Sequence, residues 1–276
     1  MNISFYKSPT SFMPKQVRPI VIFDSGVGGL SIYQEIKRAL PDLNIVYCSD
    51  TAAFPYGSKS EKEVIDRTSY CLSELAKQYQ PLLAVIACNT ASTISLPRVR
   101  AELNFPVVGV VPAIKMASKL SINRCIGLLA TPGTIERDYT DQLINEFADD
   151  CRVIRVGSSE LVYLAEQHLR GELLASGVLE QIIAPFFEHV HYPDTIVLGC
   201  THFPLLKNAL DSVTPQPVQW VDSGTAIARR VLSLLEHHLP FEATRDIFVH
   251  TGGPDSIKAL VPALGDMGFD KTVLLN

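Results

Sequence analysis

Short apolar runs alternate with longer segments of helical periodicity along the chain. The run PIVIF at residues 19–23 indicates a strand, and in the segment after it Leu30, Tyr33 and Ile36 share one helical face. Pro41 ends this predicted helix. The same alternation continues toward the C-terminus. Further strands are expected in the segments NIVYCSD, LLAVIA, PVVGVV, CIGLLA, CRVIRV, TIVLG, VQWV, DIFVHT and TVLLN.

The predicted strands are almost continuously apolar, as is typical of parallel strands covered by helices on both faces. The pattern therefore predicts an α/β fold with doubly wound parallel sheets. In such sheets ligands bind just beyond the carboxyl ends of the strands. This rule selects five short segments as candidate ligand contacts: residues 24–26, 88–90, 131–133, 200–202 and 222–224.

Two pairs of strand ends resemble each other, because FDSG is similar to VDSG and ACNT is similar to GCTH. This similarity is not a short-period repeat, and it predicts two similar α/β halves whose strand ends face each other. We expect an N-terminal extension over residues 1–18. A first domain is expected over residues 19–112 and 223–276, and a second over residues 113–222.

Composition and charge narrow the class of protein. Of the 276 residues, 47% are hydrophobic and 19% are charged, which indicates a packed core. The net charge of -5 argues against non-specific binding to nucleic acid or to anionic membranes. The polar N-terminal stretch lacks the apolar core of about 7–15 residues of a signal peptide. No run approaches the roughly 18 apolar residues of a membrane span. We expect a cytoplasmic protein with reduced thiols.

Two of the six cysteines follow predicted strands directly. There is no C-x-x-C pair, so a zinc ribbon or a thioredoxin-type site is disfavoured. Cys88 and Cys200 each lie between a strand and a predicted helix, where backbone N–H groups favour the thiolate and lower a pKa that starts near ~8.5. The pair could be a nucleophile with its resolving partner, metal ligands, or acid–base groups. A thiolate and a thiol on opposite faces of one carbon could invert a stereocentre. The other four, Cys48, Cys71, Cys125 and Cys151, fit buried packing positions.

Polar residues near these cysteines are further candidates. The turn DSGVGGL exposes N–H groups to an anion but does not match the dinucleotide fingerprint. Asp24 in this turn would suit an ammonium group, tune a thiol or cap the helix. His202 could exchange protons with Cys200. The loop FPYGSK is a ligand contact or a plain loop, and by composition alone Glu166 lies on a solvated helix face.

Together these motifs resemble the glutamate racemases, a family of cofactor-independent amino-acid racemases of cell-wall synthesis. The resembling segments are FDSGVGGLS, FPYGSKS, ACNTAS, GVVPAI, LLATPGTI, LGCTHFPLL and VDSG. The resemblance implies two α/β domains related by a pseudo-two-fold axis, with free glutamate in the cleft between them. It implies interconversion of L- and D-glutamate without a cofactor or a metal, supplying D-glutamate for peptidoglycan.

The resemblance also implies roles for individual residues. Cys88 would be the base toward D-glutamate and Cys200 the base toward L-glutamate. Asp24 would assist Cys88, His202 would assist Cys200, and Glu166 would be a supporting acid–base residue. Asp24 and His202 would also contact the substrate, together with these donors: Ser25, Tyr56, Gly57, Asn89, Thr90 and Thr201.

The chain departs from the family pattern upstream of Glu166. A Cys-Pro pair is usual there, whereas this chain has Ser158 and Ser159, and Tyr163 stands where proline is common. Some family members with an N-terminal extension need a peptidoglycan-precursor nucleotide as activator. The extension here makes such an activator a candidate partner.

Three alternatives stay open at the sequence level. The chain could racemise aspartate or another small acidic amino acid. A metal site could form from Cys88, Cys200, His202 and Asp24, or the chain could be a two-lobed anion receptor without catalysis. Two thiols directed at one ligand favour the racemase. Whether two copies form a homodimer is left open.

Overall fold

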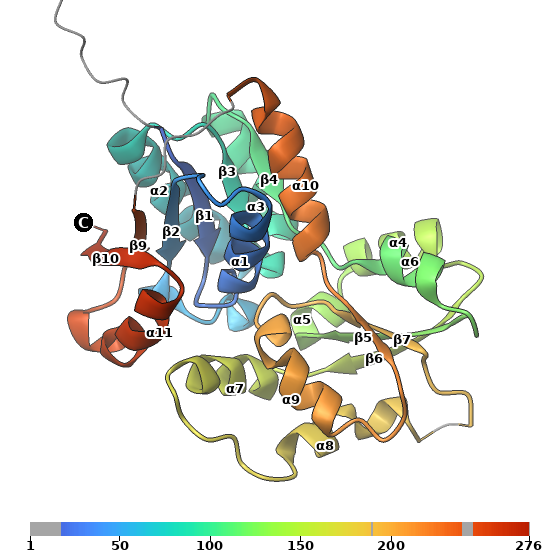
Figure 1. Cartoon of the computed structure of the whole chain (residues 1–276). Helices are drawn as coiled ribbons and strands as arrows, with labels where there is room; N and C mark the ends of the chain where they lie inside the picture. Colours follow the sequence, from blue (N-terminus) through green and yellow to red (C-terminus); the bar gives the residue numbers. More distant parts are fainter. Residues whose placement is uncertain (1–17, 189, 239–244, 276) are drawn as a thin grey trace, which may run out of the picture.

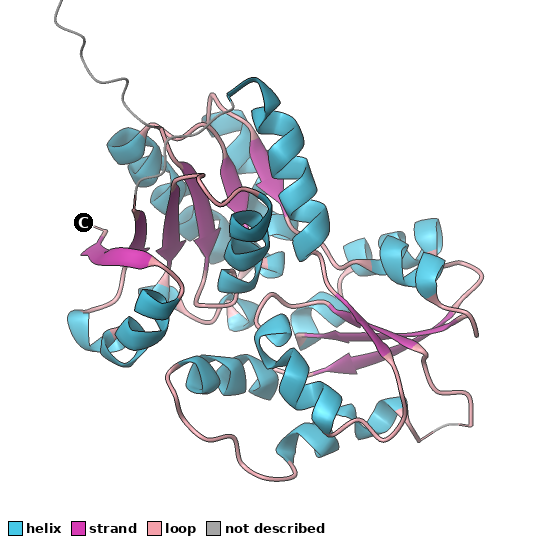
Figure 2. Ribbon diagram, in the orientation of Figure 1, coloured by secondary structure: helices cyan, strands magenta, loops and turns pink. Residues whose placement is uncertain are grey.

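The computed structural model of the chain describes residues 18–188, 190–238 and 245–275. Apart from its last residue, the predicted N-terminal extension lies outside the described residues. The described chain forms two α/β domains, each with a parallel sheet between layers of helices (Figures 1 and 2). The predicted fold class is confirmed. Among the described helices, none is both long and apolar enough to cross a membrane.

The first domain contains a six-stranded sheet in the order β10-β9-β2-β1-β3-β4, and the second a four-stranded sheet in the order β6-β5-β7-β8. Every pair of neighbouring strands is parallel. The first sheet comprises β1 (Ile20–Asp24), β2 (Ile45–Ser49), β3 (Ala84–Ile86), β4 (Val107–Gly109), β9 (Asp246–His250) and β10 (Phe269–Leu274). The second comprises β5 (Cys125–Ala130), β6 (Arg152–Gly157), β7 (Thr195–Leu198) and β8 (Gln219–Val221).

Helices cover both faces of each sheet, as Figure 1 shows. On the first sheet, one face is covered by α1 (Leu30–Ala39), α10 (Gly224–Leu235) and α11 (Val261–Asp266), and the other by α2 (Glu61–Tyr79) and α3 (Asn89–Glu102). On the second sheet, one face is covered by α4 (Ile114–Leu120) and α6 (Asp138–Phe147), and the other by α7 (Glu160–Leu169), α8 (Val178–Ile183) and α9 (Lys207–Ser212). The short helix α5 (Pro132–Ile135) follows β5.

Strand β1 shows why the apolar runs are continuous. Successive side chains of a strand point to opposite faces of the sheet. Ile20 and Ile22 pack into the core beneath α1, whereas Val21 and Phe23 pack into the core beneath α2. All four side chains have 0% exposure, so both faces of this strand are fully buried.

The two domains repeat one arrangement of four strands. The order β2-β1-β3-β4 in the first sheet is the order β6-β5-β7-β8 in the second. Cys88 follows β3 and Cys200 follows β7, which are the third strands of the two repeats. The similarity of ACNT to GCTH therefore marks equivalent positions.

The similarity of FDSG to VDSG has a different origin. Asp24 ends β1 and Asp222 follows β8, which are the first and fourth strands of their repeats. In both turns the aspartate accepts a hydrogen bond from the glycine two residues on, at 2.8 Å for Gly26 and 2.7 Å for Gly224. A shared local turn, rather than equivalent topology, accounts for this likeness.

The chain crosses between the domains twice, after β4 and after β8 (Figure 1). The Ser223 hydroxyl on the second crossing donates to the carbonyl of Val111 on the first. The predicted boundaries near residues 112 and 222 fall in these crossings, and their assignment to single residues stays a prediction. The crossings leave the carboxyl ends of β3 and β7 facing a common space.

Candidate active site

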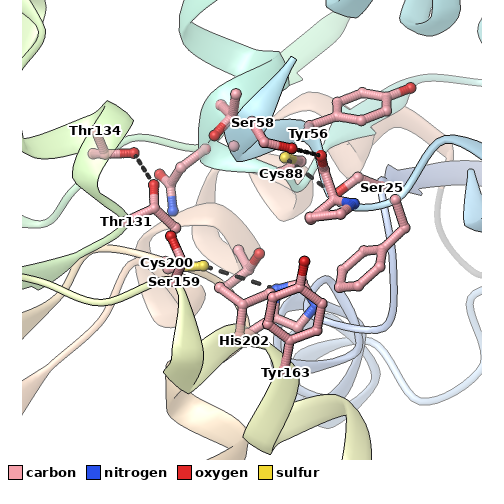
Figure 3. A pocket seen from close by; sticks show the side chains of 17 residues that line it. Ser25, Tyr56, Ser58, Cys88, Thr131, Thr134, Ser159, Tyr163, Cys200 and His202 are labelled. Atoms are coloured by element: carbon pink, nitrogen blue, oxygen red, sulfur yellow. Dashed lines mark hydrogen bonds between the residues drawn. The ribbon is translucent and has the colours of Figure 1, made fainter. Parts of the chain in front are cut away.

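A cavity of about 110 Å³ lies between the domains at the carboxyl ends of their strands. Figure 3 shows Cys88 and Cys200 with their sulfur atoms directed into it from different domains. Nine residues selected from the sequence line the cavity: Ser25, Tyr56, Gly57, Cys88, Asn89, Thr90, Cys200, Thr201 and His202. Asp24 and Glu166 lie behind this lining.

Cys88 occupies the N-cap of α3. Its Sγ accepts a hydrogen bond from the Ala91 amide at 3.5 Å and lies 3.7 Å from the Ser25 hydroxyl. Asn89 and Thr90 form the first turn of α3, so the positive end of a 14-residue helix is directed at the cavity. An anion bound beside Cys88 would be stabilised by this helix terminus.

The thiol of Cys88 is not acidic, contrary to the prediction from its position. Burial foremost, and the charge of Asp24 after it, raise its pKa to about 12 against the opposing hydrogen bonds from Ala91 and Ser25. Desolvation disfavours the thiolate more strongly than the helix terminus favours it. Cys88 is therefore a thiol that can give a proton.

Cys200 has a different environment. The predicted helix after Cys200 is present, but it begins as a 3-10 helix, Phe203–Leu206, and continues as α9. The Sγ of Cys200 lies 3.8 Å from Nδ1 of His202. Burial lowers the pKa of His202, but its hydrogen bonds to Cys200 and Glu166 outweigh burial and hold that pKa well above its ordinary value. The imidazole beside Cys200 is therefore charged.

Glu166 supports His202 from behind. It lies on α7 and is only 6% exposed, so the composition-based expectation of a solvated residue is wrong. Its Oε1 lies 3.0 Å from Nε2 of His202 and accepts a hydrogen bond from the Val27 amide of the first domain at 2.8 Å. Burial raises the pKa of Glu166, yet the hydrogen bonds, that from His202 foremost, bring it to about 2. The carboxylate is therefore ionised beside a charged imidazole.

Asp24 joins the two domains beneath the cavity. It is fully buried, accepts from Gly26 through Oδ1, and accepts from the Thr201 hydroxyl through Oδ2 at 3.1 Å. Burial raises its pKa, and the charge of His202 opposes that rise. Asp24 acts on Cys88 through its electric field and on the cavity through Ser25 and Thr201.

The glycines of the first turn permit this close approach of the domains. A Cβ atom at Gly26 would lie 2.4 Å from Oε1 of Glu166, and one at Gly28 would lie 2.4 Å from Nδ1 of His202. Both distances are far below any normal contact, so a side chain at either position would displace the His202–Glu166 pair. The absence of side chains at Gly26 and Gly28 in the DSGVGGL turn therefore allows the two domains to pack closely together.

Several lining residues were not named individually among the predicted site residues. They are Phe54, Pro55, Ser58, Thr131, Thr134, Ser159, Val162 and Tyr163. Thr131 follows β5 and belongs to the segment 131–133 that the strand-end rule selected. Tyr163 packs edge-on against Phe54 of the other domain, with ring centroids 5.8 Å apart and planes at 83°. No pattern in the sequence pairs these two aromatic residues.

The geometry of the described residues does not support the metal-site alternative. Across the described ranges, no group of three or more His, Cys, Asp or Glu side chains is arranged to hold a metal ion. Cys88 and Cys200 are free thiols.

Comparisons with known proteins agree with this geometry. The family described as Asp/Glu/Hydantoin racemase matches residues 20–231. A glutamate racemase of Escherichia coli O7:K1 is 48% identical over 261 residues, covering 93% of this chain and 91% of the relative.

Solved structures show the same likeness. A crystal structure of Escherichia coli glutamate racemase with L-glutamate and the activator UDP-MurNAc-ala has a TM-score of 0.89 at 48% identity, covering 94% of this chain and 98% of that one. The glutamate racemase isoform RacE1 of Bacillus anthracis has a TM-score of 0.79 at 29% identity, covering 94% and 97%.

Proposed function

Because the chain belongs to the Asp/Glu/Hydantoin racemase family, we propose that it interconverts L-glutamate and D-glutamate with Cys88 and Cys200 as its two acid–base groups. One observation carries the proposal: two thiols from opposite domains line one cavity. A reaction that removes a proton from one face of a carbon and returns one to the other face needs both.

The proton movements follow from the neighbours of each sulfur. With L-glutamate bound, the Cys200 thiolate takes the α-hydrogen as a proton, and the electron pair stays on the α-carbon. The Cys88 thiol then gives its proton to the opposite face, which yields D-glutamate. The reverse reaction exchanges these roles. The raised pKa of Cys88 and the charged imidazole of His202 at Cys200 both support this starting state.

The developing carbanion needs stabilisation as well as proton transfer. The N-terminus of α3 at Asn89 and Thr90 supplies N–H groups and a positive helix end to the substrate carboxylate. Hydroxyl groups line the remaining wall, from Ser25, Thr131, Thr134 and Ser159. Closure of the domains around these groups excludes water and strengthens each interaction.

The proposal also covers the use of the product and the regulation of the enzyme. D-glutamate would feed peptidoglycan synthesis, and a cytoplasmic location would keep both catalytic sulfurs reduced. The similar Escherichia coli enzyme was crystallised with the activator UDP-MurNAc-ala. We propose that a peptidoglycan-precursor nucleotide of this kind activates this protein as well.

Circular dichroism of glutamate solutions tests the proposal directly. The full-length protein, with a chelator and without pyridoxal phosphate, should racemise L-glutamate, and the nucleotide should raise that rate. L-aspartate is the matched control and should react at least about tenfold more slowly. Cys88→Ser and Cys200→Ser should each lower the racemisation rate by about 10²–10⁴-fold. Full turnover by both variants, or preference for aspartate, would overturn the proposal.

A further inference from the structure

Arg170 is the outermost member of a chain of polar contacts that reaches Cys200. It caps the C-terminal end of α7, and its side chain is 21% exposed. Its Nη1 donates to Oε2 of Glu166 at 2.5 Å and to the carbonyl of Glu166 at 2.8 Å. The guanidinium therefore holds both the carboxylate and the backbone of the residue that supports His202.

The two oxygens of Glu166 have separate partners. Oε1 accepts from His202 and from the Val27 amide, whereas Oε2 accepts from Arg170 alone among the described residues. A carboxylate held at both oxygens has one orientation. Removal of Arg170 would leave a buried oxygen without its donor and would free the group to rotate.

Several charged or titratable groups face this carboxylate and its imidazole. Asp24 faces them from β1, Tyr47 from β2 and Cys200 from the segment after β7, while Arg170 faces Glu166 from its own helix. Arg170 is the one permanent cation in this set. It pairs with Glu166 and helps to keep the pKa of that carboxyl low.

We propose that Arg170 is a positioning residue for the Cys200 half of the reaction, holding Glu166 ionised and oriented so that His202 stays charged beside Cys200. This inference rests on the proposed racemase function. Arg170 does not line the cavity, so it does not touch the substrate.

The Cys88 half lacks this support. The Sγ of Cys88 contacts the Ser25 hydroxyl and the Ala91 amide, and neither belongs to the contact chain from Arg170. Loss of the Arg170 guanidinium should therefore affect the two sulfurs unequally. Overall racemisation cannot separate them, because both directions of turnover use both thiols.

Half-reactions in deuterated water separate the two sulfurs. The Cys88→Ser background leaves only Cys200 to exchange the α-hydrogen, and the Cys200→Ser background leaves only Cys88. Arg170→Gln should slow exchange about tenfold in the first background and less than about twofold in the second. Equal slowing in both backgrounds, or no slowing in the first, would overturn the inference.

Two further variants separate positioning from general damage. Arg170→Lys keeps the cation and should restore most of the exchange lost in Arg170→Gln. Arg98→Gln removes an exposed arginine paired with Glu102 four residues on, and should leave exchange unchanged in both backgrounds. Failure of the lysine variant to recover any exchange, with its thermal unfolding unchanged, would also contradict the positioning role.

The pH profile gives an independent readout. Without Arg170 the pKa of Glu166 rises. The fall in racemisation rate at low pH should therefore begin at a pH about one unit higher in Arg170→Gln than in wild type. A fall that begins at the same pH in both would overturn the inference. Wild-type protein that does not racemise glutamate at all would instead refute the proposed function, so the two failures are distinguishable.

Discussion

Cys88 and Cys200 follow the third strands of two sheets that share one strand order, and their side chains line a single cavity. Topological equivalence places the sulfurs on opposite sides of this space. Their neighbours differ, since a serine hydroxyl lies beside Cys88 and an imidazole beside Cys200. The site is therefore symmetric in position and asymmetric in charge.

Serine at either cysteine should divide the reaction into halves. Cys88→Ser leaves Cys200 to exchange the α-hydrogen of L-glutamate, and Cys200→Ser leaves Cys88 to exchange that of D-glutamate. Racemisation should fall by about 10²–10⁴-fold in each variant, because one proton transfer has lost its catalyst. Proton NMR in deuterated water measures the exchange. Deuterium entering both enantiomers in one variant would be inconsistent with these assignments.

Alanine at Gly28 should lower activity sharply. The new Cβ would lie 2.4 Å from Nδ1 of His202, so the imidazole would have to move away from Cys200. We expect a loss in kcat of at least about tenfold, measured at saturating glutamate. Gly265→Ala is the matched control, because no atom lies within 4 Å of a Cβ built there. Equal activity in the two variants would contradict the close packing inferred at Gly28.

Glutamine at Glu166 should flatten the acid side of the stability profile. The pKa of Glu166 falls from 4.5 to about 2 on folding, so its stabilising contribution is present above about 4.5 and is lost as the pH falls toward about 2. Thermal unfolding of wild type and Glu166→Gln between pH 5 and about 2 measures the difference. Parallel curves over this range would mean that folding does not lower the pKa of Glu166.

Phenylalanine at Tyr56 should reduce stability by about 2 kcal/mol, because a buried hydrogen bond to a charged group is lost. The Tyr56 hydroxyl donates to Oδ2 of Asp50 at 2.6 Å, and Asp50 has 0% exposure. Urea unfolding gives the free energy. Tyr163→Phe is the control: Tyr163 is 48% exposed, and its variant should stay within about 0.5 kcal/mol of wild type. A similar change in both variants would argue against the buried bond.

The sequence predicts the fold and the cysteine pair well because both depend on local order. Apolar runs specify strands, and a residue directly after a strand must lie where the carboxyl ends of the parallel strands meet. The equivalence of Cys88 and Cys200 follows from this alone. Most predicted substrate contacts come from the same edges or from the loop after β2, and the structure brings them to the cavity.

The features that the sequence does not predict depend on the second domain. Glu166 is buried because α7 packs against the first domain, where Val27 donates to it. The high pKa of Cys88 reflects desolvation by the enclosed site and the charge of Asp24. Phe54 and Tyr163 meet only across the interface. Contacts between segments far apart in sequence have no local periodicity, so no local pattern reports them.

The repeated strand order bears on how two cysteines with unlike surroundings can arise at equivalent positions of one chain. A symmetric pair of one ancestral half would already place a thiol on each side of its interface, because each copy carries a cysteine after its third strand. Duplication and fusion of the gene would keep that geometry in a single polypeptide. After fusion, the two halves no longer need to have the same sequence. An imidazole can then lie beside one sulfur and not the other, a difference that a pair of identical copies could not have.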